Sequence, residues 1–268
     1  MYAQDDFESF NAPWRVYVGV FDASTDSKIR INGDVLPSPL PIDIEDTLRV
    51  DDGKLVAWGG IGWHFAKRHS VEFEFFTLGR EGTVSDSFSP PLQIGDTFIE
   101  SGQITTSYDT DVYRLTYGFS MMRSERSDFQ LKAGLHIASL SAGIGLAGAI
   151  CDPTTDPTMP PGCPVAGTGA ASESVTAPLP HLGLSYAHAL SPNWTLNVSA
   201  IGFAVELDNI DGSIVELTGD VAWQPWRNVG VGMGLRYFNV GVESGGSDLN
   251  GEFDFEYFGP ALYVAVTF

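Results

Sequence analysis

The sequence predicts an all-β fold, a transmembrane antiparallel up-and-down β-barrel of about ten strands. Three observations predict it: apolar residues recur with period two, connections alternate between short and long, and tryptophans gather near the short connections. No run of about 18 apolar residues occurs, which excludes a transmembrane helix. Barrel strands need only about 9–11 residues each, so a membrane barrel fits the same chain.

Ten segments carry the alternation, with apolar residues on one face and polar or small residues on the other. In the first of them, Trp14, Val16 and Val18 alternate with Arg15 and Tyr17. In chain order the segments are 14–20, 55–65, 71–75, 113–119, 129–135, 182–186, 194–198, 215–223, 229–235 and 262–268. Helices repeat with a period near 3.6, so this pattern predicts strands along the whole chain.

The connections between these segments alternate in length. The tight ones are 66–69, 123–128, 191–193 and 225–228, and the longest ones lie near 33–53, 84–106 and 148–172. Transmembrane barrels have short turns on the periplasmic side and long loops outside the cell. We therefore expect residues 1–13 to form a periplasmic N-terminal tail and residues 14–268 to form a single barrel domain with long extracellular loops.

Tryptophan placement supports the same architecture, because tryptophan favours the interface between membrane and water. Five of the six tryptophans fall near a tight connection or a terminus: Trp14, Trp63, Trp194, Trp223 and Trp226. The alternative is a soluble β-sandwich, which also alternates. A sandwich has no reason to sort its loops by length or its tryptophans by end, so the barrel is favoured.

The formal net charge of −20 argues against nucleic acid as a partner, because phosphate binding needs clustered Lys and Arg. Acidic residues crowd the first long connection, namely Asp43, Glu45, Asp46, Asp51 and Asp52. Carboxylate oxygens suit Ca²⁺, so calcium is the one cofactor that we consider for this segment. The alternative is a solvated acidic rim that bridges lipopolysaccharide through divalent ions.

Both cysteines, Cys151 and Cys163, lie in one stretch rich in Pro and Gly. This favours a loop-closing disulfide in an oxidising compartment, with two free thiols as the alternative.

The final segment, 261–268, alternates and ends on Phe268. It resembles the signal that the barrel-assembly machinery reads in the outer-membrane β-barrel superfamily. Two further stretches, 42–52 and 108–118, are similar to those of small, uncharacterised Gram-negative outer-membrane barrel proteins. The resemblance implies a bacterial outer-membrane location, contact with membrane lipid and lipopolysaccharide, and assembly by that machinery. It implies no activity, because a fold does not specify a function.

The face opposite the apolar set is expected to line the lumen, with both signs of charge. Its residues are Arg15, Tyr17, Trp58, Glu72, Glu74, Arg114, Lys132, His136, His181, Glu216, Asp220 and Arg236. Such groups most simply pair and plug a narrow barrel, because buried charges persist when paired. The alternative is a passage, suggested by the small residues Gly230, Gly232 and Gly234. These glycines could leave a cavity or make room for a large side chain from across the lumen.

His136 and His181 fall on consecutive strands with inward parity. They could titrate as a pair or bind a transition metal, or they could make ordinary hydrogen bonds in the lumen. The other histidines map to the periplasmic side, so none lies at the outer mouth where a membrane hydrolase would need it. The sequence therefore predicts no catalysis.

Two functions follow from this reading. The first is a monomeric, porin-like barrel that forms a narrow, low-conductance passage for small solutes or ligands. The second is a plugged structural or adhesive barrel whose acidic extracellular loops bind a surface partner. A hydrolase of the outer leaflet is the least favoured function.

Overall fold

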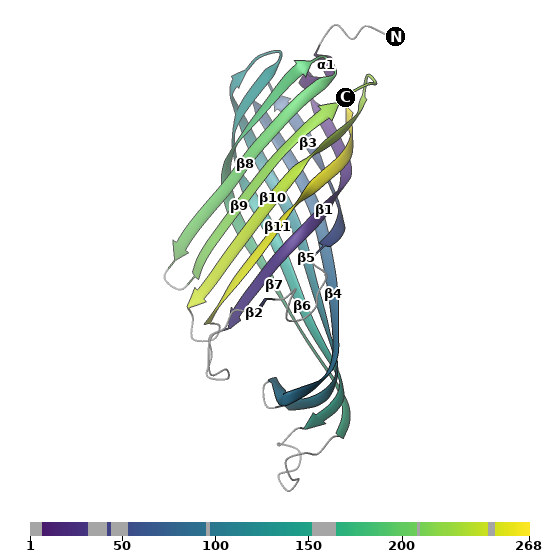
Figure 1. Cartoon of the computed structure of the whole chain (residues 1–268). Coiled ribbons are helices and arrows are strands. Elements are labelled where there is room, and N and C mark those ends of the chain that lie inside the picture. Colours follow the sequence, from purple (N-terminus) through teal and green to yellow (C-terminus); the bar gives the residue numbers. More distant parts are fainter. Residues whose placement is uncertain are drawn as a thin grey trace.

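The computed structural model describes residues 7–31, 42–43, 53–94, 97–151, 165–207, 210–245 and 250–268. Within these ranges the elements are α1 (Glu8–Asn11), β1 (Trp14–Ile31), β2 (Ile42–Asp43), β3 (Gly53–Ala66), β4 (His69–Ile94), β5 (Thr97–Arg123), β6 (Ser127–Cys151), β7 (Val165–Ser191), β8 (Trp194–Leu207), β9 (Ile210–Trp223), β10 (Val229–Gly245) and β11 (Asn250–Thr267). All pairings between strands are antiparallel, and β11 returns to pair with β1. The sheet therefore closes into a barrel (Figure 1).

The predicted fold class is confirmed. Each of the ten alternating segments lies within one long strand, and the two-residue strand β2 is added beside β1. Both termini lie at the end of the barrel that carries the tight turns (Figure 1). Among the described residues, no helix is long and apolar enough to cross a membrane.

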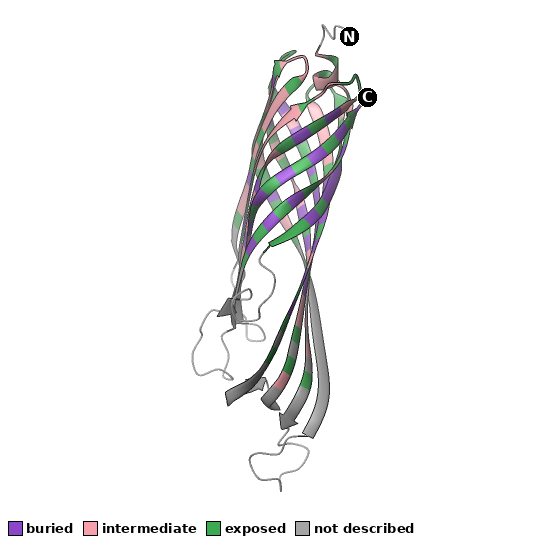
Figure 2. Cartoon of the chain, turned by 45° about the vertical axis from the view of Figure 1, so that its right-hand side comes forward, coloured by how far each residue is buried: buried purple, intermediate pink, exposed green. Residues whose placement is uncertain are grey.

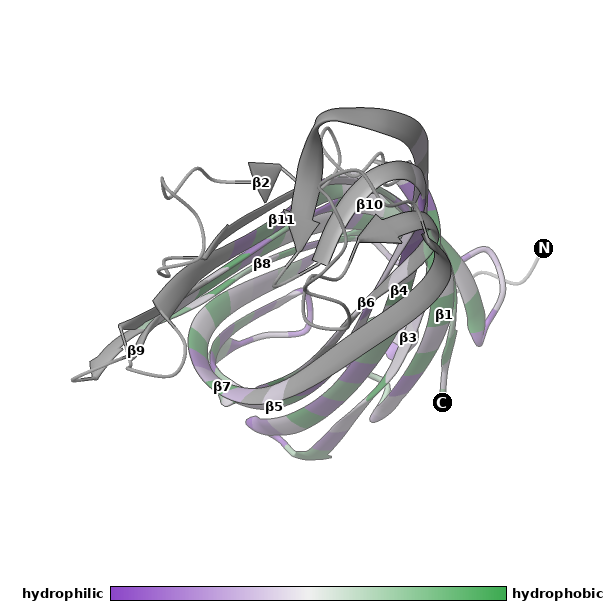
Figure 3. Ribbon diagram, turned by 90° about the horizontal axis from the view of Figure 1, so that it is seen from below, coloured by the Kyte–Doolittle hydropathy of each residue, from purple (hydrophilic) through white to green (hydrophobic). Residues whose placement is uncertain are grey.

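Side chains alternate between the two faces of the barrel wall, because successive strand residues point to opposite sides of a sheet. Large apolar residues such as Val18, Leu115 and Leu262 are exposed on the outer face, while their neighbours in sequence are buried (Figure 2). The same alternation of hydropathy is visible along the strands in Figure 3. A wall of exposed apolar residues around a closed barrel is the surface that lipid covers.

Aromatic rings mark the tight-turn end of this outer face. Trp14 stacks on Trp63 with ring centroids 4.9 Å apart, and Trp63 packs on Phe65 at 5.5 Å. The ring of His69 continues the row at 5.8 Å from Phe65. This is the girdle expected where the wall leaves the membrane.

Four strands, β4 to β7, run far beyond the closed part of the barrel (Figure 1). Pairing between β3 and β4 stops at Phe76, and pairing between β7 and β8 begins at Leu182. The pairings of β4 with β5, β5 with β6 and β6 with β7 continue well past those levels. We call the part of β4–β7 beyond Phe76 and Leu182 the extension.

The extension corrects the expected loop at 84–106. This stretch is strand on both sides of residues 95–96, with β4 paired to β5 as far as the pair Ile94 and Thr97. Its many Gly, Ser and Asp residues predict a loop, but β6 supplies a second ladder of hydrogen bonds to β5. The connection expected at 148–172 is likewise shorter than predicted, because β6 reaches Cys151 and β7 begins at Val165.

Several predictions fall on residues outside the described ranges. Cys163 is one of them, so the disulfide with Cys151 stays a prediction without support. Of the acidic residues considered for calcium, only Asp43 is described, where its backbone pairs with Lys28, while Glu45, Asp46, Asp51 and Asp52 lie outside. In the described part of the chain, no group of three or more His, Cys, Asp or Glu residues is arranged to hold a metal ion.

Candidate functional site

The interior of the barrel is the candidate site, and its side chains form three layers along the axis. We name them the chamber, at the tight-turn end, the charged layer, in the middle, and the aromatic plug, on the side of the extension. All three consist of residues with the inward register of their strands.

The charged layer joins strands from different sides of the barrel. Arg236 of β10 donates to Glu74 of β4, with Nη2 and Oε1 2.5 Å apart. Arg114 of β5 pairs with Glu216 of β9 and also lies 3.3 Å from Glu74. His136 Nε2 lies 3.1 Å from the second oxygen of Glu216. All five side chains are buried, so each charge depends on the others for compensation.

His181 lies beside this layer. Its ring centroid is 4.6 Å from that of His136, and its Nε2 lies 3.1 Å from the hydroxyl oxygen of Thr116. Each of the two rings therefore has an oxygen partner at Nε2, while Nδ1 of each is buried without a hydrogen-bond partner in the described part of the chain. Among the described residues no third ligand completes a metal site around the pair.

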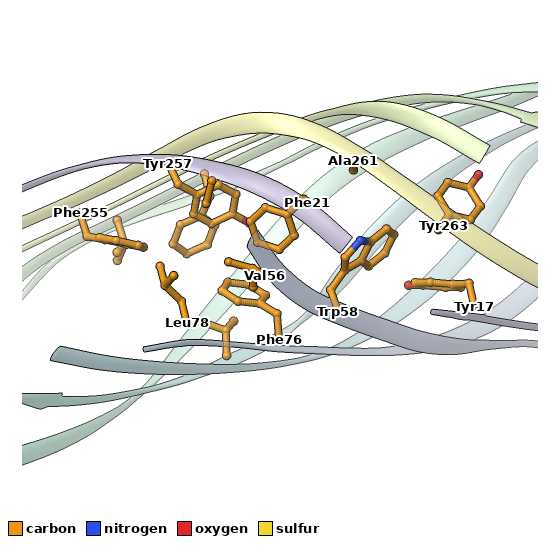
Figure 4. Close-up of a cluster of buried hydrophobic side chains, with 14 of the residues drawn as sticks. Tyr17, Phe21, Val56, Trp58, Phe76, Leu78, Phe255, Tyr257, Ala261 and Tyr263 are labelled. Carbon is orange, nitrogen blue, oxygen red and sulfur yellow. The ribbon is translucent and has the colours of Figure 1, made fainter. Parts of the chain in front are cut away.

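The aromatic plug fills the lumen on the side of the extension (Figure 4). Phe238 of β10 stacks on Tyr257 of β11 at 5.3 Å, and Phe21 of β1 packs on Tyr257 at 5.1 Å. Phe76 of β4 lies 5.6 Å from Phe21 and 6.5 Å from Phe238. The exposed fractions of Phe21, Tyr257 and Phe238 are 0%, 0% and 2%, so these rings leave no open path between them.

The chamber is a cavity of about 260 Å³ between the charged layer and α1. Lys132 Nζ donates to Glu72 at 3.1 Å, and Tyr17 donates to Glu74 at 2.8 Å. Arg15 Nη2 donates to the hydroxyl of Tyr263 at 2.9 Å. Ser9, Phe10 and Ala12, in and next to α1, complete the lining at the mouth on the tight-turn side.

The structure brings together all twelve residues that the sequence assigns to the lumen. Nine of them line the chamber: Arg15, Tyr17, Trp58, Glu72, Glu74, Arg114, Lys132, Asp220 and Arg236. The other three, His136, His181 and Glu216, lie in or beside the charged layer.

Sequence reasoning missed the aromatic plug. A signal for the plug was present in the alternation. Phe21 lies an even number of positions from Arg15, and Phe76 from Glu74, so each ring is on the inward face of its strand. Both uses considered for the inward glycines occur, since Gly230 and Gly234 line the chamber while Gly232 leaves room for a large side chain from the neighbouring strand. A Cβ atom on Gly232 would overlap the ring of Tyr263 on the neighbouring strand β11, so the small residue makes room for a ring beside it.

Comparisons with known proteins identify the fold. No protein-family model and no curated protein matches the chain. The outer membrane protease OmpT from Escherichia coli is similar in structure, with a TM-score of 0.60, 10% sequence identity, and coverage of 95% of this chain and 96% of that one. The attachment invasion locus protein Ail of Yersinia pestis (TM-score 0.31, 9% identity) covers 93% of this chain and 98% of its own. The P. putida toluene transporter TodX (TM-score 0.37, 10% identity) covers 97% and 92%.

The similarity to OmpT shows a shared barrel fold, and the apolar outer wall of this chain is the surface that such a barrel presents to lipid. The prediction that it is not an enzyme is wrong as stated. It rested on the positions of the histidines alone, whereas the same fold carries a protease in OmpT. At 10% identity that similarity shows the shared fold and assigns no reaction to this chain.

Proposed function

We propose that this barrel is sealed along its lumen and acts through the extension, which binds a partner protein by strand addition. The observation that carries the proposal is the pair of open sheet edges on the extension. In the described residues, β4 has no neighbour beyond Phe76 on the β3 side, and β7 has none before Leu182 on the β8 side.

An open edge exposes backbone N–H and C=O groups that another strand can pair with. On the β4 edge, the backbone carbonyl of Gly79 accepts a hydrogen bond from the side chain of Lys54 and not from the backbone of a neighbouring strand. Exposed acidic residues, Glu81 and Asp109, lie on the same part of the extension. They favour an extended partner segment that carries Lys or Arg.

The filled lumen supports a surface role over a passage. A solute would have to cross both the charged layer and the aromatic plug, and both consist of buried side chains. The narrow passage remains the rival function, and planar-bilayer conductance distinguishes the two. We expect the refolded full chain to show no steady single-channel current, and a steady, resolvable current would contradict the sealed lumen.

Strand addition has its own test, which uses short, extended, Lys-containing peptides selected for binding from a displayed random library. Hydrogen exchange should show new protection of backbone amides at the β4 or β7 edge when a selected peptide binds. The amides of β5 and β6 in the extension are already paired on both sides and should not change.

A matched pair of variants locates the contact. Ser85 on the edge strand β4 lies directly opposite Gln103 on the interior strand β5, and both side chains are exposed. A charge on an edge strand discourages pairing, so Ser85→Lys should weaken peptide binding while Gln103→Lys should not. Equal loss in both variants, or peptide protection confined to the turns at the other end, would contradict strand addition at the β4 edge.

A further inference from the structure

The charges of the chamber are balanced in number but are not all paired. Its lining includes four basic residues and four acidic ones: Arg15, Arg114, Lys132, Arg236, Glu72, Glu74, Asp128 and Asp220. Six of these eight have an ion-pair partner within 4.0 Å. Among the described residues, Arg15 and Asp220 have none.

Both of these residues contact the same hydroxyl group. Arg15 Nη2 donates to Tyr263 Oη, and Tyr263 in turn donates to Asp220 Oδ1. Asn197 also donates to Oδ1, at 3.0 Å. The hydrogen bonds of the described residues therefore leave Asp220 Oδ2 and most guanidinium N–H groups of Arg15 without a protein partner. The guanidinium of Arg15 also lies 5.7 Å and 5.5 Å from the ring centroids of Tyr17 and Tyr263, so Arg15 and Asp220 form an opposite-charge pair bridged by Tyr263, with hydrogen-bonding capacity left for a ligand.

An aromatic wall adjoins this pair. Tyr17 and Trp58 lie 5.0 Å apart, and Trp58 and Tyr263 lie 5.8 Å apart, measured between ring centroids. Trp58 is 7% exposed and lines the chamber, and its indole N–H has no hydrogen-bond acceptor. The chamber thus offers one cation, one anion and aromatic faces within a volume of about 260 Å³.

We propose that the chamber binds a small zwitterion with the chemistry of a free α-amino acid. Its carboxylate is recognised by Arg15, its ammonium group by Asp220, and its side chain packs on the aromatic wall. A volume slightly below that of typical drug-sized sites, about 300–1,000 Å³, suits a molecule of this size. The inference goes beyond binding at the extension, because it concerns the opposite end of the barrel.

The ligand enters from the periplasm. The charged layer and the aromatic plug close the chamber toward the extension, whereas among the described residues its other end is covered only by the short segment around α1. Ser9 and Phe10 of α1 line the chamber directly, so the helix must shift to admit or release a ligand.

The test measures equilibrium binding of radiolabelled leucine and tryptophan to the refolded full chain in detergent. Two analogues of leucine separate the charges: leucinamide keeps only the ammonium group, and N-acetyl-leucine keeps only the carboxylate. We expect the free amino acids to bind and each analogue to bind at least about tenfold more weakly. Absence of binding by both amino acids up to about 10 mM would overturn the proposal, as would equal binding of leucine and leucinamide.

Variants assign the two contacts. Arg15→Gln should weaken leucine binding at least about tenfold yet leave the binding of leucinamide unchanged, and Asp220→Asn should leave that of N-acetyl-leucine unchanged. Arg68→Gln is the control, because Arg68 is exposed on the turn between β3 and β4 and does not line the chamber. Equal weakening of leucine binding by Arg68→Gln would overturn the assignment. If a chamber variant fails to fold, the comparison of leucine with its two analogues on the unaltered protein still decides the proposal.

Discussion

At the scale of single residues, two glycines of β3 show how closely the inner wall is packed. A Cβ atom on Gly60 would lie 2.5 Å from the hydroxyl of Tyr17 and 2.6 Å from the carbonyl oxygen of Phe73. Gly62, two residues further on the same face, has only one atom near that position, at 4.0 Å. Position 60 therefore has no room for a side chain, whereas position 62 has room for a methyl group.

We expect Gly60→Ala to lower the free energy of unfolding by about 1–3 kcal/mol, because the added methyl group forces Tyr17 or the strand to move. Gly62→Ala should change it by about 0.5 kcal/mol or less. Urea unfolding followed by the shift between folded and unfolded bands on a gel measures both. Similar stability of the two variants would show that the inner wall relaxes freely around Tyr17.

Glu216 is the residue on which most of the charged layer converges, since it contacts Arg114, Arg236 and His136. Glu216→Gln removes one partner of a buried network and leaves cations uncompensated, so it should destabilise the barrel by about 3–5 kcal/mol. Glu81→Gln, at an exposed position on β4, is the matched control and should be close to neutral. The same urea titration tests this, and a neutral Glu216→Gln would mean that the layer tolerates an unpaired cation.

At the scale of elements, α1 is held across the mouth at the tight-turn end by contacts to two different turns. The guanidinium of Arg126 lies 4.6 Å from the ring centroid of Phe7, and Asn11 donates to the carbonyl of Glu125 at 3.2 Å. On the other side, Arg227 lies 3.9 Å from Glu8. These contacts are few and exposed, so the helix is only lightly held.

Arg126→Ala should therefore speed amide exchange in residues 7–12 by about two- to fivefold, since an exposed cation–π contact is worth about 0.5–1 kcal/mol. Hydrogen exchange with mass spectrometry reports this segment directly. Arg68→Ala serves as the control, because Arg68 is outside the chamber and has no described contact with α1. Unchanged exchange in Arg126→Ala would mean that other contacts hold the helix in place.

The strands could be predicted from the sequence because each has one apolar face, and lipid selects that face along the full length of the wall. The extension escaped prediction at stretches such as 97–106, where apolar residues do not alternate regularly and the strand is held by backbone pairing on both sides. In the lumen, Arg15 and Glu74 could be assigned by parity alone. Phe21 and Phe76 lie on the same inward face. Because they are apolar, however, their residue type does not distinguish them from the lipid-facing residues.

At the scale of the whole molecule, the lumen has two barriers in series, the charged layer and the aromatic plug. Removing one should leave the other in place. We expect the double variant Phe238→Ala, Tyr257→Ala to show no steady current in a planar bilayer, although losing two buried rings lowers stability by about 3–5 kcal/mol for each. The gel shift verifies that the variant is folded. A resolvable current in this variant, absent from the unaltered protein, would show that the plug is the only barrier.

The seam that closes the barrel joins the two long strands that are most distant in sequence. β1 and β11 pair from Arg15 with Thr267 to Ile31 with Gly251, and backbone hydrogen bonds link Trp14 and Phe268 in both directions. All other neighbouring long strands are consecutive in the chain, so hairpins can form locally and early. The seam has the highest contact order in the molecule and cannot form before the last residues are synthesised. Until then the sheet has two open edges, which can pair with other chains. Closure is therefore the slow step, and aggregation competes with membrane insertion until it occurs.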